Sequence, residues 1–197
     1  MPDSPDVVNQ KATLRTGLLA ARAARSPADR AAAAEALCAG LLPALAGIPV
    51  VAATAPVADE PGAGRLPAAL RPAVGRVLLP VVPATGRELA WAVDDGTLST
   101  GRFGLLEPTG PRLPAETLAT ADVIVVPALA VAPDGTRLGR GGGYYDRALR
   151  HARPDAVLVA LVFDEELVPE LPAGQFDRPV SAVVTPGGGW QLLGTTS

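Results

Sequence analysis

The residues best suited to chemistry lie in one short stretch, Arg137 to Asp146, where glycines, arginines, tyrosines and a carboxylate follow one another. Four glycines in five positions let the backbone take positive φ angles and approach a ligand with no side chain in the way. Successive N–H groups can then point into one concavity, beside the positive end of a following helix. The arginines add fixed positive charge, and Asp146 offers oxygen ligands to a divalent cation. This combination predicts a site for a polyphosphate and its metal ion.

Two common phosphate-binding motifs are excluded in this stretch. No Gly-Lys-Ser/Thr follows, and the third glycine position of the dinucleotide fingerprint is Tyr144. A flexible loop without a ligand is the alternative, because the chain contains 21 glycines. A second cluster, Gly187 to Gly189, has no flanking charge and no following helix, and we expect an inert tail there.

The N-terminal region contributes a second basic feature. Of the 17 basic residues, only Lys11 is a lysine, which offers a compact point charge where arginine offers a planar fork. A helical pattern over residues 7–24 places Leu14, Leu18 and Ala21 on one side, and Lys11 and Arg15 one turn apart on a shared face. The two basic residues are either ligand-binding groups or part of a solvated charged face.

Composition excludes several functional classes. A hydrophobic content of 48% excludes a disordered chain, and a net charge of −3 argues against a nucleic-acid or membrane-surface binder. A single cysteine, Cys38, excludes an internal disulfide and a cysteine-based zinc site. There is no apolar signal core and no uninterrupted run of about 18 apolar residues. We therefore expect a cytoplasmic protein.

Helical and strand patterns alternate along the chain. Ser26 and Pro27 begin a second helix that we expect to end near Leu42, before Pro43. The segment 94–114 reads as irregular, and Glu107 is expected to order that loop. Short helices are predicted over 66–70 and 144–150. Strands are predicted over 48–53, 77–82, 156–162 and 180–184, over 88–93 at a sheet edge, and in the C-terminal part of the segment 117–130.

Most of these strands are continuous apolar runs rather than alternating ones. Such strands form a largely parallel sheet that is covered on both faces. Ligands of open parallel sheets bind beyond the carboxyl ends of the strands, where the glycine stretch leaves its own strand. The sequence therefore predicts one α/β domain over residues 1–197 with its site at that edge.

Several segments resemble the 5-formyltetrahydrofolate cyclo-ligase family. Val126 to Ala130 followed by Asp134 to Arg147 closely resembles the family's signature. Three further regions agree in order and spacing: Lys11 to Arg15; Leu79 to Val82 with Gly101 to Pro108; and Leu171 to Asp177 with Val183 to Thr185. The resemblance covers nearly the whole chain. It implies a three-layer α/β/α sandwich with a mostly parallel central sheet.

The resemblance also implies a reaction, namely ATP- and Mg²⁺-dependent cyclisation of 5-formyltetrahydrofolate to 5,10-methenyltetrahydrofolate with release of ADP and phosphate. The partners that it implies are small molecules, reduced folate and ATP. With the net charge of −3, we expect no nucleic-acid or membrane partner, and we expect a monomer. The implied catalytic residues are Lys11, Arg15 and Arg140. ATP would be bound by Lys11, Arg15, Arg137, Leu138, Gly139, Arg140, Gly141, Gly142, Gly143, Tyr144 and Tyr145, folate by Glu60, Phe103 and Tyr145, and Mg²⁺ by Asp146 and Asp177.

Three positions depart from the family pattern. Gly142 stands where many members carry lysine, Phe176 where a polar residue is common, and Thr54 where a tyrosine is common. A diverged relative that binds folate or nucleotide with little or no turnover is therefore one alternative. A sugar-phosphate isomerase or CoA-transferase on a similar sheet is another, and it would not need Lys11, Arg15 or Asp146 for ATP and Mg²⁺.

Overall fold

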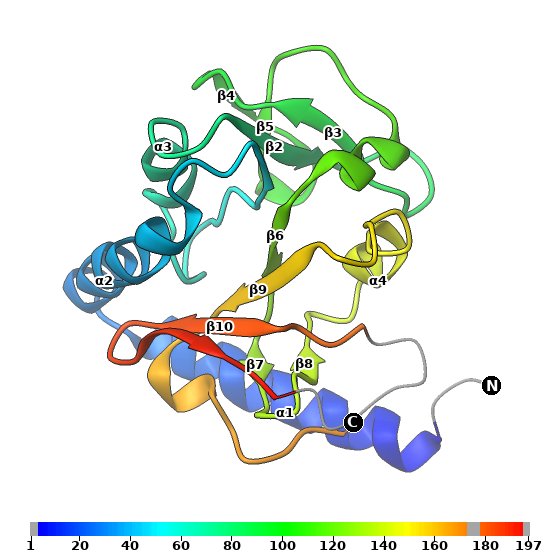
Figure 1. The fold of residues 1–197 in the computed structure, drawn as a ribbon. Coiled ribbons are helices and arrows are strands. Elements are labelled where there is room, and N and C mark those ends of the chain that lie inside the picture. The colour runs from blue at the N-terminus through cyan, green and yellow to red at the C-terminus, as the bar shows by residue number, and fades with distance from the viewer. Residues whose placement is uncertain (1–3, 173–177, 195–197) are drawn as a thin grey trace.

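A computed structural model describes residues 4–172 and 178–194, and its centre is a seven-stranded sheet (Figure 1). The strand order is β11-β10-β9-β6-β1-β2-β3. The five inner strands run parallel to one another, and the two edge strands, β11 and β3, run antiparallel to their neighbours. The bounds are β1 Val50–Ala52, β2 Arg76–Val81, β3 Ala90–Val93, β6 Val123–Pro127, β9 Val157–Leu161, β10 Ala182–Thr185 and β11 Gly189–Leu192. The predicted mostly parallel sheet is confirmed, and so is the edge strand near residues 88–93.

Helices cover both faces of this sheet and make three layers (Figure 1). Strand residues alternate between two buried clusters, since Val125 packs toward one face and its neighbour Val126 toward the other. The first cluster includes α2 (Pro27–Leu45) and α3 (Leu66–Leu70), and the second includes η2 (Ala115–Thr120) and α4 (Tyr144–Ala148). The predicted three-layer α/β arrangement is confirmed.

The direction of winding reverses between β1 and β6. From β1 the chain passes through α3 to β2 on one side, whereas from β6 it passes through α4 to β9 on the other. The two crossover helices lie on opposite faces of the sheet. Such a reversal leaves a crevice at the carboxyl ends of the two central strands, which is where open α/β sheets bind ligands.

Helix α1 (Pro5–Ala24) buries a polar stripe, not an apolar one. Lys11 and Arg22 are buried, whereas Leu14 is 38% exposed and Ala21 is exposed. The helix itself is confirmed, but a solvated face for Lys11 is contradicted. The physical reason is the surface that α1 covers, because it presents the carboxylate of Glu166 and backbone carbonyl oxygens, which need positively charged donors.

Three local expectations are corrected. Helix α2 continues through Pro43 to Leu45, because Leu41 and Leu45 are fully buried and their packing outweighs the missing N–H of the proline. The segment 94–114 contains a hairpin, β4 (Leu98–Thr100) and β5 (Leu106–Pro108), joined through η1 (Arg102–Gly104). The Gly187–Gly189 cluster is not an inert tail, because it forms the turn between β10 and β11.

A second small hairpin leads into the glycine stretch. Its strands are β7 (Ala130–Val131) and β8 (Arg137–Leu138). A short 3-10 helix, η3 (Asp164–Glu166), follows β9.

Across the described ranges 4–172 and 178–194, no helix combines the length and apolar character needed to cross a membrane.

Candidate functional site

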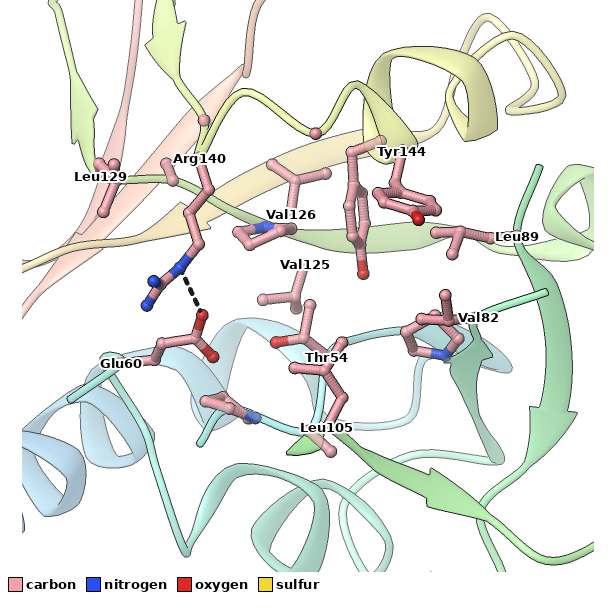
Figure 2. A pocket seen from close by; sticks show the side chains of 18 of the residues that line it. Thr54, Glu60, Val82, Leu89, Leu105, Val125, Val126, Leu129, Arg140 and Tyr144 are labelled. Carbon is pink, nitrogen blue, oxygen red and sulfur yellow. Dashed lines mark hydrogen bonds and ion pairs between the residues drawn. The ribbon is translucent and has the colours of Figure 1, made fainter. Parts of the chain in front are cut away.

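A cavity of about 220 Å³ opens at the reversal point between β1 and β6 (Figure 2). One part of its wall is apolar and includes Val82, Leu89 and Leu105. Another part is formed by the glycine loop, which we define as Gly139 to Gly143. The cavity therefore places an apolar surface suited to a flat organic ring next to a backbone suited to an anion.

Two residues of the glycine loop have the positive φ angles expected from the sequence. Gly141 and Gly143 have φ angles of +91° and +69°, in the left-handed region that favours glycine. A Cβ at Gly141 would lie 3.3 Å from Cζ of Arg15. A Cβ at Gly142 would lie 3.0 Å from the ring of Tyr144, so any larger residue at this position would require that ring to shift slightly.

Helix α1 approaches the glycine loop through Arg15. Its Nε donates a hydrogen bond to the carbonyl oxygen of Gly139 at 2.9 Å. Lys11, one turn earlier, is buried with 7% exposure. Neither side chain lines the cavity, whereas the glycine loop forms part of its wall. The two predicted residues thus lie on the helix that contacts the glycine loop, and their side chains do not line the cavity.

Arg137 and Asp146 form an ion pair at the cavity wall. The Arg137 side chain is only 4% exposed, whereas that of Asp146 is 35% exposed and accessible from the cavity. Asp177, the other predicted metal ligand, lies outside the described residues. No cluster of three or more His, Cys, Asp or Glu residues is present in the part of the chain that the structure describes.

This donor set fits Mg²⁺ rather than a metal held by protein ligands alone. Mg²⁺ is usually held by one or two carboxylates together with substrate phosphates and water. Asp146 offers a hard oxygen donor to the same cavity that the glycine loop lines, which meets that requirement.

Arg140 reaches from the glycine loop to the loop after β1 (Figure 2). Its Nε donates to Oε1 of Glu60 at 3.1 Å, and its second amino group donates to Asp59 at 3.3 Å. Oε2 of Glu60 accepts the backbone N–H of Val57 at 3.0 Å. A residue predicted for phosphate and one predicted for folate are thus paired with each other.

Tyr145 contributes a buried hydroxyl to the cavity. Its oxygen has no hydrogen-bond partner within residues 4–172 and 178–194. Burial raises the pKa of Tyr145 strongly and the negative charge of Glu60 raises it further, while Arg137 opposes them. The phenol therefore stays neutral and can donate a hydrogen bond to an acceptor on a ligand.

Phe103 stands at the cavity wall with 71% of its surface exposed. It lies in η1, between β4 and β5. Glu107 also lines the cavity but is buried, and it accepts the backbone N–H of Val82 at 2.9 Å. The predicted substrate residues Glu60, Phe103 and Tyr145 therefore surround one cavity.

One polar pair beside the cavity was not predicted. Arg22 on α1 donates to Glu166 at 2.6 Å and 2.8 Å and to the carbonyl oxygen of Ala128 at 2.7 Å, and both side chains are 2% exposed. Glu166 is 144 positions away from Arg22, which no local pattern can predict. The one available signal is that Arg22 continues the helical stripe of Lys11 and Arg15.

Comparisons with known proteins agree with this geometry. The model of the 5-formyltetrahydrofolate cyclo-ligase family matches residues 7–186. A 5-formyltetrahydrofolate cyclo-ligase of Mycolicibacterium smegmatis is 46% identical over 181 residues, which cover 89% of this chain and 93% of that protein. One from Escherichia coli is 42% identical over 77 residues, 38% of this chain and 41% of its own.

Solved structures show the same fold. The NMR structure of Aquifex aeolicus 5,10-methenyltetrahydrofolate synthetase superposes with a TM-score of 0.74 at 28% identity and covers 95% of this chain and 93% of that one. A synthetase of that name from Mycoplasma pneumoniae gives a TM-score of 0.68 at 19% identity, covering 88% of this chain and 96% of its own, which is a likeness of fold.

Proposed function

Because this chain belongs to the 5-formyltetrahydrofolate cyclo-ligase family, we propose that its cavity catalyses ATP- and Mg²⁺-dependent cyclisation of 5-formyltetrahydrofolate to 5,10-methenyltetrahydrofolate. ADP and phosphate are the other products. The observation that carries the proposal is that one cavity is lined both by the glycine loop and by apolar side chains. Such a lining would suit a triphosphate at the glycine loop and a folate ring system against the apolar side chains.

The chemistry explains why a nucleotide is needed. A formamide carbon is a poor electrophile, because its nitrogen donates electrons into the carbonyl group. In the proposed first step the formyl oxygen attacks the γ-phosphorus of ATP and ADP leaves. N10 of the folate then attacks the activated carbon and loses its proton, and phosphate departs. Positioning and charge stabilisation account for most catalysis of phosphoryl transfer.

The proposed roles follow the side chains around the cavity. Arg137, Arg140 and the glycine loop would bind the ATP phosphates from the cavity side, and Lys11 and Arg15 would add positive charge from α1. Glu60 would accept hydrogen bonds from the donor-rich edge of the pterin. The neutral Tyr145 hydroxyl would donate to an acceptor on the folate.

A Mg²⁺ ion would be held by Asp146 and the phosphates of ATP, with Asp177 as a further proposed ligand. When bound, the ion neutralises charge that develops on the transferred phosphoryl group. Arg137 would fix the orientation of Asp146 through the ion pair between them.

Arg140 and Glu60 must separate for both proposed ligands to bind. Their side chains are 48% and 18% exposed, so the pair is partly solvated and weak. Phosphate oxygens of ATP would replace Glu60 and Asp59 as partners of Arg140. Glu60 would then be available to the pterin. Binding of ATP would in this way prepare the folate site.

The alternative is a relative that binds folate or nucleotide without turnover, favoured by the absence of a lysine at Gly142. The test is the growth of absorbance in the band of the methenyl product when protein, 5-formyltetrahydrofolate and Mg·ATP are mixed. Product formation with one ADP per methenyl group supports the cyclo-ligase. Tight binding of both ligands with no product would establish the alternative.

The proposal includes a cytoplasmic monomer whose partners are small molecules. A reaction between two dissolved metabolites requires no second subunit and no membrane surface. Sedimentation of the purified chain with and without Mg·ATP would test the oligomeric state, since a dimer in either condition would contradict it.

A further inference from the structure

We propose that Glu107 and Arg102 are positioning residues that hold the ring of Phe103 at the cavity mouth, where it stacks on the flat heterocycle of the substrate. This inference rests on the proposed function, because it takes a folate as the occupant of the apolar part of the cavity. It assigns a role at the site to two residues: Glu107, which was expected from the sequence only to order its loop, and Arg102, which was given no role there.

The backbone of Phe103 adopts a conformation that is unfavourable for a residue with a bulky side chain. Its φ and ψ are 58° and 21°, in the left-handed region that a bulky side chain rarely enters. The ring is 71% exposed, although it is among the most apolar side chains of the protein. Such a conformation persists only where surrounding contacts determine it, and it is found most often at sites that hold ligands.

Glu107 provides the first of these contacts. Its carboxylate is buried with 7% exposure and accepts the N–H of Val82, just beyond the end of β2, at 2.9 Å. Gly101 packs directly against this carboxylate, since a Cβ at Gly101 would lie 2.6 Å from both of its oxygens. The N–H of Gly101 donates to the carbonyl oxygen of Leu105 at 2.7 Å and closes the turn that carries Phe103. Glu107 therefore fixes the turn to the central sheet.

Arg102 provides the second contact. One of its amino groups donates to the carbonyl oxygens of Pro83 and Ala84, each at 2.6 Å. Its Cζ lies 5.1 Å from the centre of the Phe103 ring, which is a cation–π contact. The guanidinium thus supports one side of the ring, and the ring remains accessible to the cavity that it lines.

The arrangement suits a planar, aromatic ligand. Ring pairs prefer offset-stacked or edge-to-face contacts, and their attraction depends on the position and tilt of each ring. Ordering a free phenyl group on binding would reduce affinity, so a ring held in place beforehand binds more tightly. Loss of either support should therefore weaken binding of folate and leave binding of ATP unchanged.

The test compares Glu107→Ala with Glu107→Gln, whose amide oxygen can still accept the Val82 N–H. We expect Glu107→Ala to raise the KM for 5-formyltetrahydrofolate about three- to tenfold, the range for loss of one aromatic contact, with the KM for ATP unchanged. Glu107→Gln should remain near wild type. Glu116→Ala, at an exposed acid on η2, is the matched control.

A second measurement separates positioning from general damage and does not need turnover. In a Phe103→Trp background, bound folate should quench the fluorescence of the introduced indole without ATP present. Adding Arg102→Ala, a change at an exposed residue that leaves the core intact, should raise the folate concentration for half quenching by a similar factor. Arg112→Ala is its matched control.

Three results would overturn the inference. They are unchanged folate affinity in both Glu107→Ala and Arg102→Ala, an equal rise of both KM values, or a Glu107→Gln variant as impaired as Glu107→Ala. Quenching that follows this pattern in a protein without turnover would support the positioning role while contradicting the proposed reaction.

Discussion

Nε of Arg15 donates a hydrogen bond to the carbonyl oxygen of Gly139 at 2.9 Å, although the two residues are 124 positions apart. This contact joins the N-terminal helix to the start of the glycine loop. The guanidinium also lies where a side chain at Gly141 would have to be placed. Helix α1 is therefore part of the structure that shapes the loop, as well as a source of positive charge near it.

The first prediction concerns the planar guanidinium group of Arg15. Arg15→Lys keeps the charge but loses the Nε donor and the flat surface against Gly141. We expect the KM for ATP to rise at least about tenfold, on the order of 1.4 kcal/mol. Steady-state kinetics measure this. Arg150→Lys, at an exposed arginine on the same chain, should be unaffected, and equal KM values in both variants would contradict a specific role for Arg15.

The second prediction concerns the backbone of the glycine loop. Gly141→Ala places a methyl group against the Arg15 guanidinium and forces a non-glycine residue to a φ of +91°. Strain of this kind costs roughly 1–3 kcal/mol. Gly47→Ala is a matched control, because Gly47 has a φ of +76° with no atom near the new methyl group.

We expect both glycine variants to lower the free energy of unfolding, measured by urea denaturation, to a similar extent. Only Gly141→Ala should also lower kcat/KM for ATP, by about tenfold or more. Equal activity in the two variants would mean that the shape of the loop does not determine nucleotide binding.

Much of this arrangement follows from local patterns in the sequence. The apolar runs Val123–Val126 and Val157–Leu161 predict buried parallel strands, because no alternation of polar residues marks a solvated face. The spacing of glycines predicts a loop with positive φ angles, which Gly141 and Gly143 adopt. Together these features predict a site at the carboxyl edge of the sheet.

The rest depends on contacts between distant segments. The buried face of α1 is polar because Arg22 meets Glu166 and Arg15 meets Gly139, and neither partner is visible in the pattern of the helix. The hairpin that carries Phe103 has strands of only three residues, too short for a periodicity signal. The pairing of Arg140 with Glu60 joins two loops that sequence reasoning assigned to different ligands.

The third prediction is a coupling between the two ligands through Arg140 and Glu60. If ATP separates this pair, an ATP analogue with a non-transferable γ-phosphate should tighten folate binding by about fivefold or more, and folate should tighten binding of the analogue by the same factor. Titration calorimetry with each ligand first and then both measures the coupling.

The Arg140→Gln variant removes the ion pair and should abolish this coupling, with folate bound equally well in the presence and absence of the analogue. Arg65→Gln is the control, because Arg65 forms an exposed pair with Glu35 at 3.5 Å. Coupling that survives in Arg140→Gln would show that the pair does not link the sites.

The fourth prediction concerns the buried phenol of Tyr145. Its pKa is raised in the folded protein, so above the ordinary tyrosine pKa of about 10 the folded state holds a proton that the unfolded state has lost. Stability must therefore fall as the pH rises through that range. Tyr145→Phe removes the ionisable group and should reduce this loss.

Urea denaturation at about pH 8 and about pH 10.5 tests this difference. The wild type should lose more free energy of unfolding between the two pH values than Tyr145→Phe does. The variant should also turn over more slowly near neutral pH, because the donor to the folate is lost. Equal pH dependence of stability in the two proteins would place the Tyr145 hydroxyl in contact with water.

The central claim is that this cavity activates the formyl oxygen by phosphorylation, and the fate of that oxygen is its most direct test. 5-Formyltetrahydrofolate labelled with ¹⁸O in the formyl group is converted with unlabelled Mg·ATP, and the released phosphate is analysed by mass spectrometry. We predict one ¹⁸O atom in the phosphate for each methenyl product formed. Unlabelled phosphate, with the ¹⁸O released as water, would contradict the account.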